Sequence, residues 1–122
     1  MPRIADYSII TDGKFAIQTG GDIDKDFDFT LESGANLGSR SILAFVLFVK
    51  SNANNLAFEV KINGSEALNY KFDSFQINTL HEVIAANVLK AAPNANNIAF
   101  RITGGSGTLE FGDVVLWWQR DV

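Results

Sequence analysis

The sequence predicts an all-β protein, an antiparallel two-sheet β-sandwich that forms a single domain over residues 1–122. Short apolar segments recur along the chain with turn-forming residues between them. Most of these segments alternate apolar and polar side chains, which is the period of a half-buried strand. The phrase NANNLAFEV at residues 52–60 returns as NANNIAFRI at residues 94–102, so an Asn-rich turn twice leads into a strand of the same phase.

The first third of the chain predicts a hairpin followed by a strand. Residues 7–11 and 14–18 flank Asp12-Gly13, a pair that tolerates the positive φ angles of a tight hairpin turn. Residues 26–32 then alternate, and the predicted inward side chains are Phe27, Phe29 and Leu31.

Residues 41–50 predict a long strand that is apolar on both faces. Such a strand needs a loop, a third layer or another subunit over its outer face. We expect one of its two apolar sets to point outward. It would form an interface with another subunit or, alternatively, lie under a covering loop. The predicted patch is Leu43, Phe45, Leu47 and Val49.

The second half of the chain predicts strands at residues 55–62, 67–72, 97–103 and 108–119. Residues 80–92 also suit a helix by propensity. We interpret them as a strand running into a turn at residues 86–90, because Pro93 and the Asn cluster follow at once. The two copies of the repeat suggest equivalent strands in the two halves of the sandwich, with Glu59 and Arg101 as a cross-strand pair.

The composition excludes several classes of partner. The formal net charge is −4 and the basic residues are scattered, which argues against nucleic acids and against an anionic membrane surface. The longest apolar run, residues 42–49, is far shorter than the ~20 residues of a membrane helix. The N-terminal residues resemble no signal peptide, so we expect a cytoplasmic protein or one exported without a Sec signal.

Residues 83–116 resemble the end of galactose-binding-like jelly rolls, the fold of many carbohydrate-binding modules. The resemblance rests on VIAANVLK at residues 83–90, NIAFRI at 97–102 after an Asn-rich turn, and LEFGDVVL at 109–116. Residues 47–64 are similar to the middle of such modules. Where the family often has Gly before the Asn, this chain has Pro93. The resemblance implies a jelly-roll sandwich and a non-catalytic module that binds carbohydrate.

Four alternating aspartates form a candidate Ca²⁺ site, with Asp22, Asp24 and Asp26 as the expected ligands and Asp28 beyond them. In an extended segment these carboxylates share one face and repel one another, which a cation would relieve. The family that this chain resembles often carries a structural Ca²⁺ near its first strands. The alternative, which the residues themselves favour, is a solvated strand face.

Trp117 and Trp118 are adjacent in a predicted strand and therefore point to opposite faces. We expect Trp118 in the core and Trp117 on the outer face. An exposed Trp can stack on a sugar ring, anchor a protein interface or lie under a loop. The predicted sugar platform combines Trp117 with Tyr70, Asn63 and Gln119.

The recognisable catalytic motifs of known enzymes are missing from this sequence. Spacing alone does not decide on a carboxylate pair for glycoside hydrolysis, but such a pair needs a deep cleft, which small jelly rolls rarely provide. The sequence has no cysteine and one histidine, His81, which argues against a zinc site, and the absence of a G-x-S-x-G elbow argues against a Ser-His-Asp triad. We therefore expect no enzyme. The function predicted is a non-catalytic, carbohydrate-binding module, and the alternative is a structural or assembly protein that forms a homo-oligomer or a subunit of a larger particle.

Overall fold

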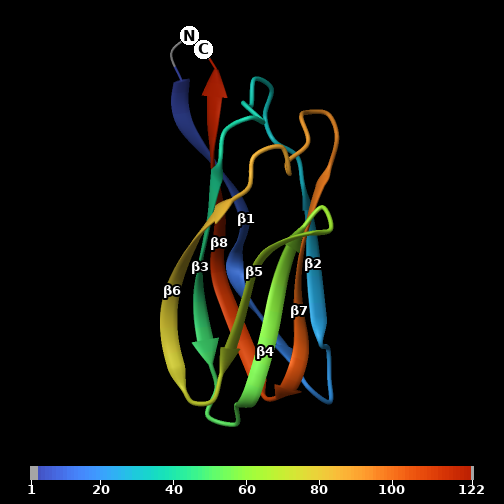
Figure 1. Ribbon diagram of the computed structural model, residues 1–122, viewed down its shortest axis with the longest axis vertical. Helices are drawn as coiled ribbons and strands as arrows, with labels where there is room; N and C mark the ends of the chain where they lie inside the picture. Colours follow the sequence, from blue (N-terminus) through green and yellow to red (C-terminus); the bar gives the residue numbers. More distant parts are fainter. Residues whose placement is uncertain (1–2, 122) are drawn as a thin grey trace.

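The computed structural model describes residues 3–121 as a sandwich of two antiparallel four-stranded sheets (Figure 1). Sheet A has the order β1-β8-β3-β6, and sheet B has the order β2-β7-β4-β5. This is the strand order of a jelly roll, and it confirms the predicted all-β sandwich. The strands are β1 (Arg3–Gln18), β2 (Asp24–Phe29), β3 (Ser41–Val49), β4 (Asn54–Ile62), β5 (Ser65–Phe72), β6 (Gln76–Ile84), β7 (Asn96–Ser106) and β8 (Thr108–Asp121).

The core between the sheets is built around phenylalanine rings. Phe45 and Phe111 enter it from sheet A, and Phe58 and Phe100 from sheet B; all four are fully buried. The rings of Phe100 and Phe111 meet with centroids 4.8 Å apart, and those of Phe58 and Phe111 at 5.5 Å. Large rings from both layers therefore fill the space between the two sheets.

The prediction that Leu43, Phe45, Leu47 and Val49 form an outer patch is wrong. None of the four side chains is more than 1% exposed, and all belong to the core. The cause is the register of β3 on β8, which sets Leu43 opposite Leu116 and Leu47 opposite Phe111, both buried. The outward residues of β3 are therefore the alternate set, Ile42, Ala44, Val46 and Phe48.

The predicted hairpin at Asp12-Gly13 is also wrong, because β1 runs unbroken from Arg3 to Gln18. Both of its halves pair with the long strand β8, and the register shifts between Ile9 and Lys14. The Gly13 N–H donates to Thr11 Oγ1 at 3.3 Å within this irregular stretch. The turn-forming residues therefore make a bulge in one strand, since β8 offers a partner to both halves.

The two copies of the repeat become β4 and β7, which lie side by side in sheet B and not in opposite sheets. Their register sets Glu59 opposite Arg101, as expected for a cross-strand pair.

The ambiguous segment 80–92 is strand β6 up to Ile84 and irregular beyond it, which confirms the interpretation as a strand. No helix in residues 3–121 is long and apolar enough to cross a membrane.

Candidate functional site

The outer face of sheet B is polar and hollowed. A hollow of about 260 Å³ lies over β2, β7 and β4, and we call it the sheet B groove. It is lined by Asp24, Lys25, Asp26, Glu59, Lys61, Asn97, Ala99 and Arg101.

Strand register places the charges of the groove in two neighbouring rows. One row runs from Asp24 through Arg101 to Glu59. The next runs from Asp26 through Ala99 to Lys61. Along β7, Ala99 lies between Asn97 and Arg101, whose side chains are larger. The small side chain of Ala99 therefore forms the floor of the hollow.

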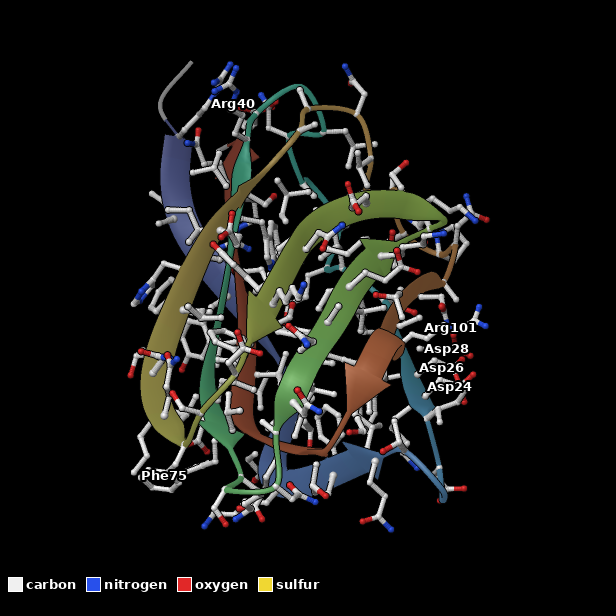
Figure 2. The ribbon with its side chains drawn as sticks, turned by 60° about the horizontal axis from the view of Figure 1, so that its bottom comes forward. Asp24, Asp26, Asp28, Arg40, Phe75 and Arg101 are labelled. Carbon is white, nitrogen blue, oxygen red and sulfur yellow. The ribbon has the colours of Figure 1, made fainter. Side chains whose placement is uncertain are left out.

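The groove contains both fixed and unpaired polar groups. The Asn97 side-chain amide donates to Asp26 Oδ2 at 2.8 Å and to Asp28 Oδ1 at 2.9 Å. Lys61 Nζ lies 3.7 Å from Glu59 Oε1. Within residues 3–121 the exposed guanidinium of Arg101 forms no ion pair, although Asp24 and Glu59 flank it in the register. Figure 2 shows Asp24, Asp26, Asp28 and Arg101 together beside β2 and β7.

The predicted Ca²⁺ ligands are only partly brought together. Asp24 and Asp26 share one face of β2, whereas Asp22 precedes this strand and its backbone carbonyl accepts from Gln18 N at 2.8 Å. In the part of the chain that the structure describes, no group of three or more Asp, Glu, His or Cys side chains is arranged to hold a metal ion. The Ca²⁺ site stays a prediction.

The side chains of Trp117 and Trp118 point to the two faces that the sequence predicts. Trp118 is 3% exposed, and its Nε1–H donates to Ser8 Oγ at 3.0 Å. Trp117 is 43% exposed on the outer face of sheet A, where its ring lies 5.1 Å from that of Tyr7 at an angle of 45°. A small hollow of about 100 Å³ beside Trp117 also includes Gln119 and the exposed Arg40.

The other residues of the predicted sugar platform lie elsewhere. Tyr70 is on β5 of sheet B, and its phenol donates to Glu82 of β6 across the open edge of the sandwich. This hydrogen bond, with smaller effects of burial and of the Glu82 charge, raises the pKa of Tyr70. Asn63 lies in the β4–β5 turn and bonds to Val88 O, Asn96 Oδ1 and Asn97 N. Only Gln119 remains beside Trp117, and its Oε1 already accepts from Ser39 Oγ at 3.2 Å.

Sequence reasoning missed the sheet B groove as a site, although its signal was present. The alternating aspartates and the pair of Glu59 and Arg101 were each recognised separately. The order β2-β7-β4 unites them on one face, and this order follows from pairings far apart in the sequence.

Neither a protein-family model nor a curated protein matches the sequence, but solved structures match its fold. The dimeric latent PorU from Porphyromonas gingivalis matches over 98% of this chain with a TM-score of 0.69 and 11% identity. BpGH86A, a β-porphyranase of glycoside hydrolase family 86 from Bacteroides plebeius, matches over 97% with a TM-score of 0.67 and 19% identity. The chain spans only 12% and 21% of the lengths of these two proteins.

The xylan-binding module CBM15 matches along nearly the whole of both chains. The match covers 96% of this chain and 97% of that module, with a TM-score of 0.58 and 11% identity. At such identity the likeness shows the fold alone. This chain therefore has the jelly-roll β-sandwich fold that carbohydrate-binding modules use.

Proposed function

We propose that this chain is a non-catalytic module that binds a neutral saccharide in the sheet B groove. One observation carries the proposal: hydrogen-bond donors and acceptors alternate around the floor at Ala99, on the outer face of sheet B. The shared fold with a xylan-binding module supports the class of ligand, and the choice of surface comes from the chemistry of the groove.

The groove has the hydrogen-bonding capacity that a sugar needs. Each sugar hydroxyl donates one hydrogen bond and accepts others, so neighbouring hydroxyls suit a surface where the two functions alternate. The carboxylates of Asp24 and Glu59 accept, and the guanidinium of Arg101 between them donates. Hydrogen bonds to charged groups are about twice as strong as those between neutral ones. Two adjacent hydroxyls over Arg101 would therefore accept hydrogen bonds from its guanidinium and donate to the carboxylates of Asp24 and Glu59.

The balance of charge in the groove favours a neutral ligand over an anionic one. Its lining contains three acidic side chains and three basic ones, so it has no net formal charge to attract a polyanion. The lining has no aromatic ring on which a sugar could stack. We therefore expect weak binding, with a dissociation constant of about 0.1–1 mM.

Calorimetric titration with cello-, xylo- and agaro-oligosaccharides tests this function. Binding of at least one of them, weakened about tenfold or more by Arg101→Ala, supports the proposal. Lys71→Ala is the matched control, because Lys71 is an exposed cation on β5, outside the groove lining. Release of new reducing ends from the bound oligosaccharide would contradict the non-catalytic part.

A further inference from the structure

We propose that the outer face of sheet A is an interface between two copies of this chain. This face carries the outer apolar patch, which we define as Tyr7, Ile9, Ile42, Val83, Val115 and Trp117. Five of these side chains are 41% to 57% exposed, and Val115 is half-buried. The inference is independent of saccharide binding, because the sheet B groove lies on the other side of the sandwich.

The patch is continuous across all four strands of sheet A. Register sets Tyr7 opposite Trp117, Trp117 opposite Ile42, and Ile42 opposite Val83, which gives one unbroken row. On sheet B the corresponding outer positions carry Asp24, Arg101, Glu59 and Asn69. One face of the sandwich is therefore solvated, and the other has the character of a sheet that packs on a second layer.

The neighbouring row has smaller side chains at its centre. It runs from Ile9 through Val115 and Ala44 to His81. Two copies can be related by a twofold axis that lies in the plane of their interface, runs perpendicular to the strands and passes between the two rows. This axis places the large row of one copy over the small row of the other. The patch is therefore complementary in shape to a second copy of itself.

The charges around the patch fit the same arrangement. Arg40 lies at one end of the face, directly before β3, and Asp113 lies near the middle of β8. Both are exposed, and neither forms an ion pair within residues 3–121. Gly112, the residue before Asp113, pairs with Val46 of β3. Val46 is six residues beyond Arg40, which corresponds to about 20 Å along the strand. The same twofold axis brings Arg40 of one copy towards Asp113 of the other.

The area of the patch limits the strength of the dimer. Four strands about 4.8 Å apart, over the six residues of about 3.3 Å each from Arg40 to the level of Gly112, give a footprint of roughly 400 Å² that contains the apolar patch. With its polar rim, a pair of such faces buries about 1,000 Å², the low end for a specific interface. We therefore expect a dimer with a dissociation constant in roughly the micromolar range.

Sedimentation equilibrium of the full chain tests the interface. We expect a monomer–dimer equilibrium whose dissociation constant rises at least about tenfold in Ile42→Glu. Phe75→Glu is the matched control, since Phe75 is 59% exposed in the β5–β6 loop, far from Arg40 at the other end of the molecule (Figure 2). Arg40→Glu should weaken the dimer, and Asp113→Lys in the same chain should restore it.

Two results would overturn the inference. One is a chain that stays monomeric at the highest soluble concentration. The other is a dimer that Ile42→Glu leaves unchanged while thermal melting shows that the variant is folded. In the first case, a Trp117 fluorescence response to an oligosaccharide would assign this face to a sugar. Saccharide binding in the sheet B groove is measured separately, so either proposal can fail without the other.

Discussion

The side-chain amide of Asn63 donates to Asn96 Oδ1 at 2.9 Å and ties the β4–β5 turn to the start of β7. Asn96 is fully buried, and its Oδ1 also accepts from Lys90 N at 2.7 Å. Its Nδ2 donates to Lys90 O at 3.2 Å. One buried amide therefore holds the irregular segment after β6 against the sheet, and Asn63, predicted as a sugar ligand, is already occupied by this network.

Replacing Asn96 with Ala should lower the free energy of unfolding by about 1–3 kcal/mol, because it removes a buried side-chain amide and leaves the part-buried backbone N–H and C=O of Lys90 without their partner. Thermal or urea unfolding measures the change. Asn94→Ala is the control: the Asn94 side chain is exposed in the same turn, and its loss should stay within about 0.5 kcal/mol. Equal effects of the two substitutions would contradict the role of the network.

Substitutions of the inward residues of β3 should destabilise the fold and not an assembly. Phe45→Ala removes a ring from the centre of the core and should cost about 3–5 kcal/mol of unfolding free energy. Ile77→Ala, at a side chain that is 58% exposed, should change it by less than about 0.5 kcal/mol. Urea denaturation compares the two. A Phe45→Ala variant as stable as the wild type would show that the assigned faces of β3 are reversed.

The two tryptophans should differ in their access to a quencher. In Trp118→Phe the remaining Trp117 is exposed, so acrylamide should quench its fluorescence strongly in dilute solution. In Trp117→Phe the remaining Trp118 is buried and should be shielded. Quenching of Trp117 should also fall as protein concentration rises and dimers form. Similar quenching of both single-Trp variants in dilute solution would contradict the strand orientation of β8.

Tyr70 should ionise above its ordinary pKa of 10.0, because its hydrogen bond to Glu82 is lost when the phenol is deprotonated. The folded state therefore holds this proton more tightly than the unfolded state. The stability it contributes is complete below the ordinary pKa and declines as pH rises towards the raised one.

Absorbance titration of the phenolate in a Tyr7→Phe background checks this, since the chain has two tyrosines and only Tyr70 then remains. Glu82→Gln in the same background should lower the pKa of Tyr70 towards 10.0. An unchanged titration curve would mean that Glu82 does not hold the phenol in solution.

Local sequence patterns predicted the strands better than they predicted how the strands meet. Alternation and turn residues identified the strands and set Trp118 inside. Both faces of β3 are apolar, however, so alternation alone could not decide whether Leu43 or Ile42 faces the core. That choice depends on the register with β8, a strand far away in the sequence.

The same limit explains the errors at the candidate sites. The Asp12-Gly13 pair suits a hairpin locally, but β8 pairs with residues on both sides of it. Tyr70 and Trp117 were predicted to share one sugar platform, but the topology places them in different sheets. The sheet B groove depends on three strands from distant parts of the chain, so no single segment could reveal it.

The most direct test of the proposed function compares oligosaccharide binding by the wild type, Arg101→Ala and Trp117→Ala in one calorimetric series. We expect Arg101→Ala to weaken binding about tenfold or more and Trp117→Ala to leave it unchanged. Binding that Trp117→Ala abolishes and Arg101→Ala spares would contradict a sugar site in the sheet B groove and would move the site to sheet A. Absence of binding to every oligosaccharide tested would contradict the proposed function itself.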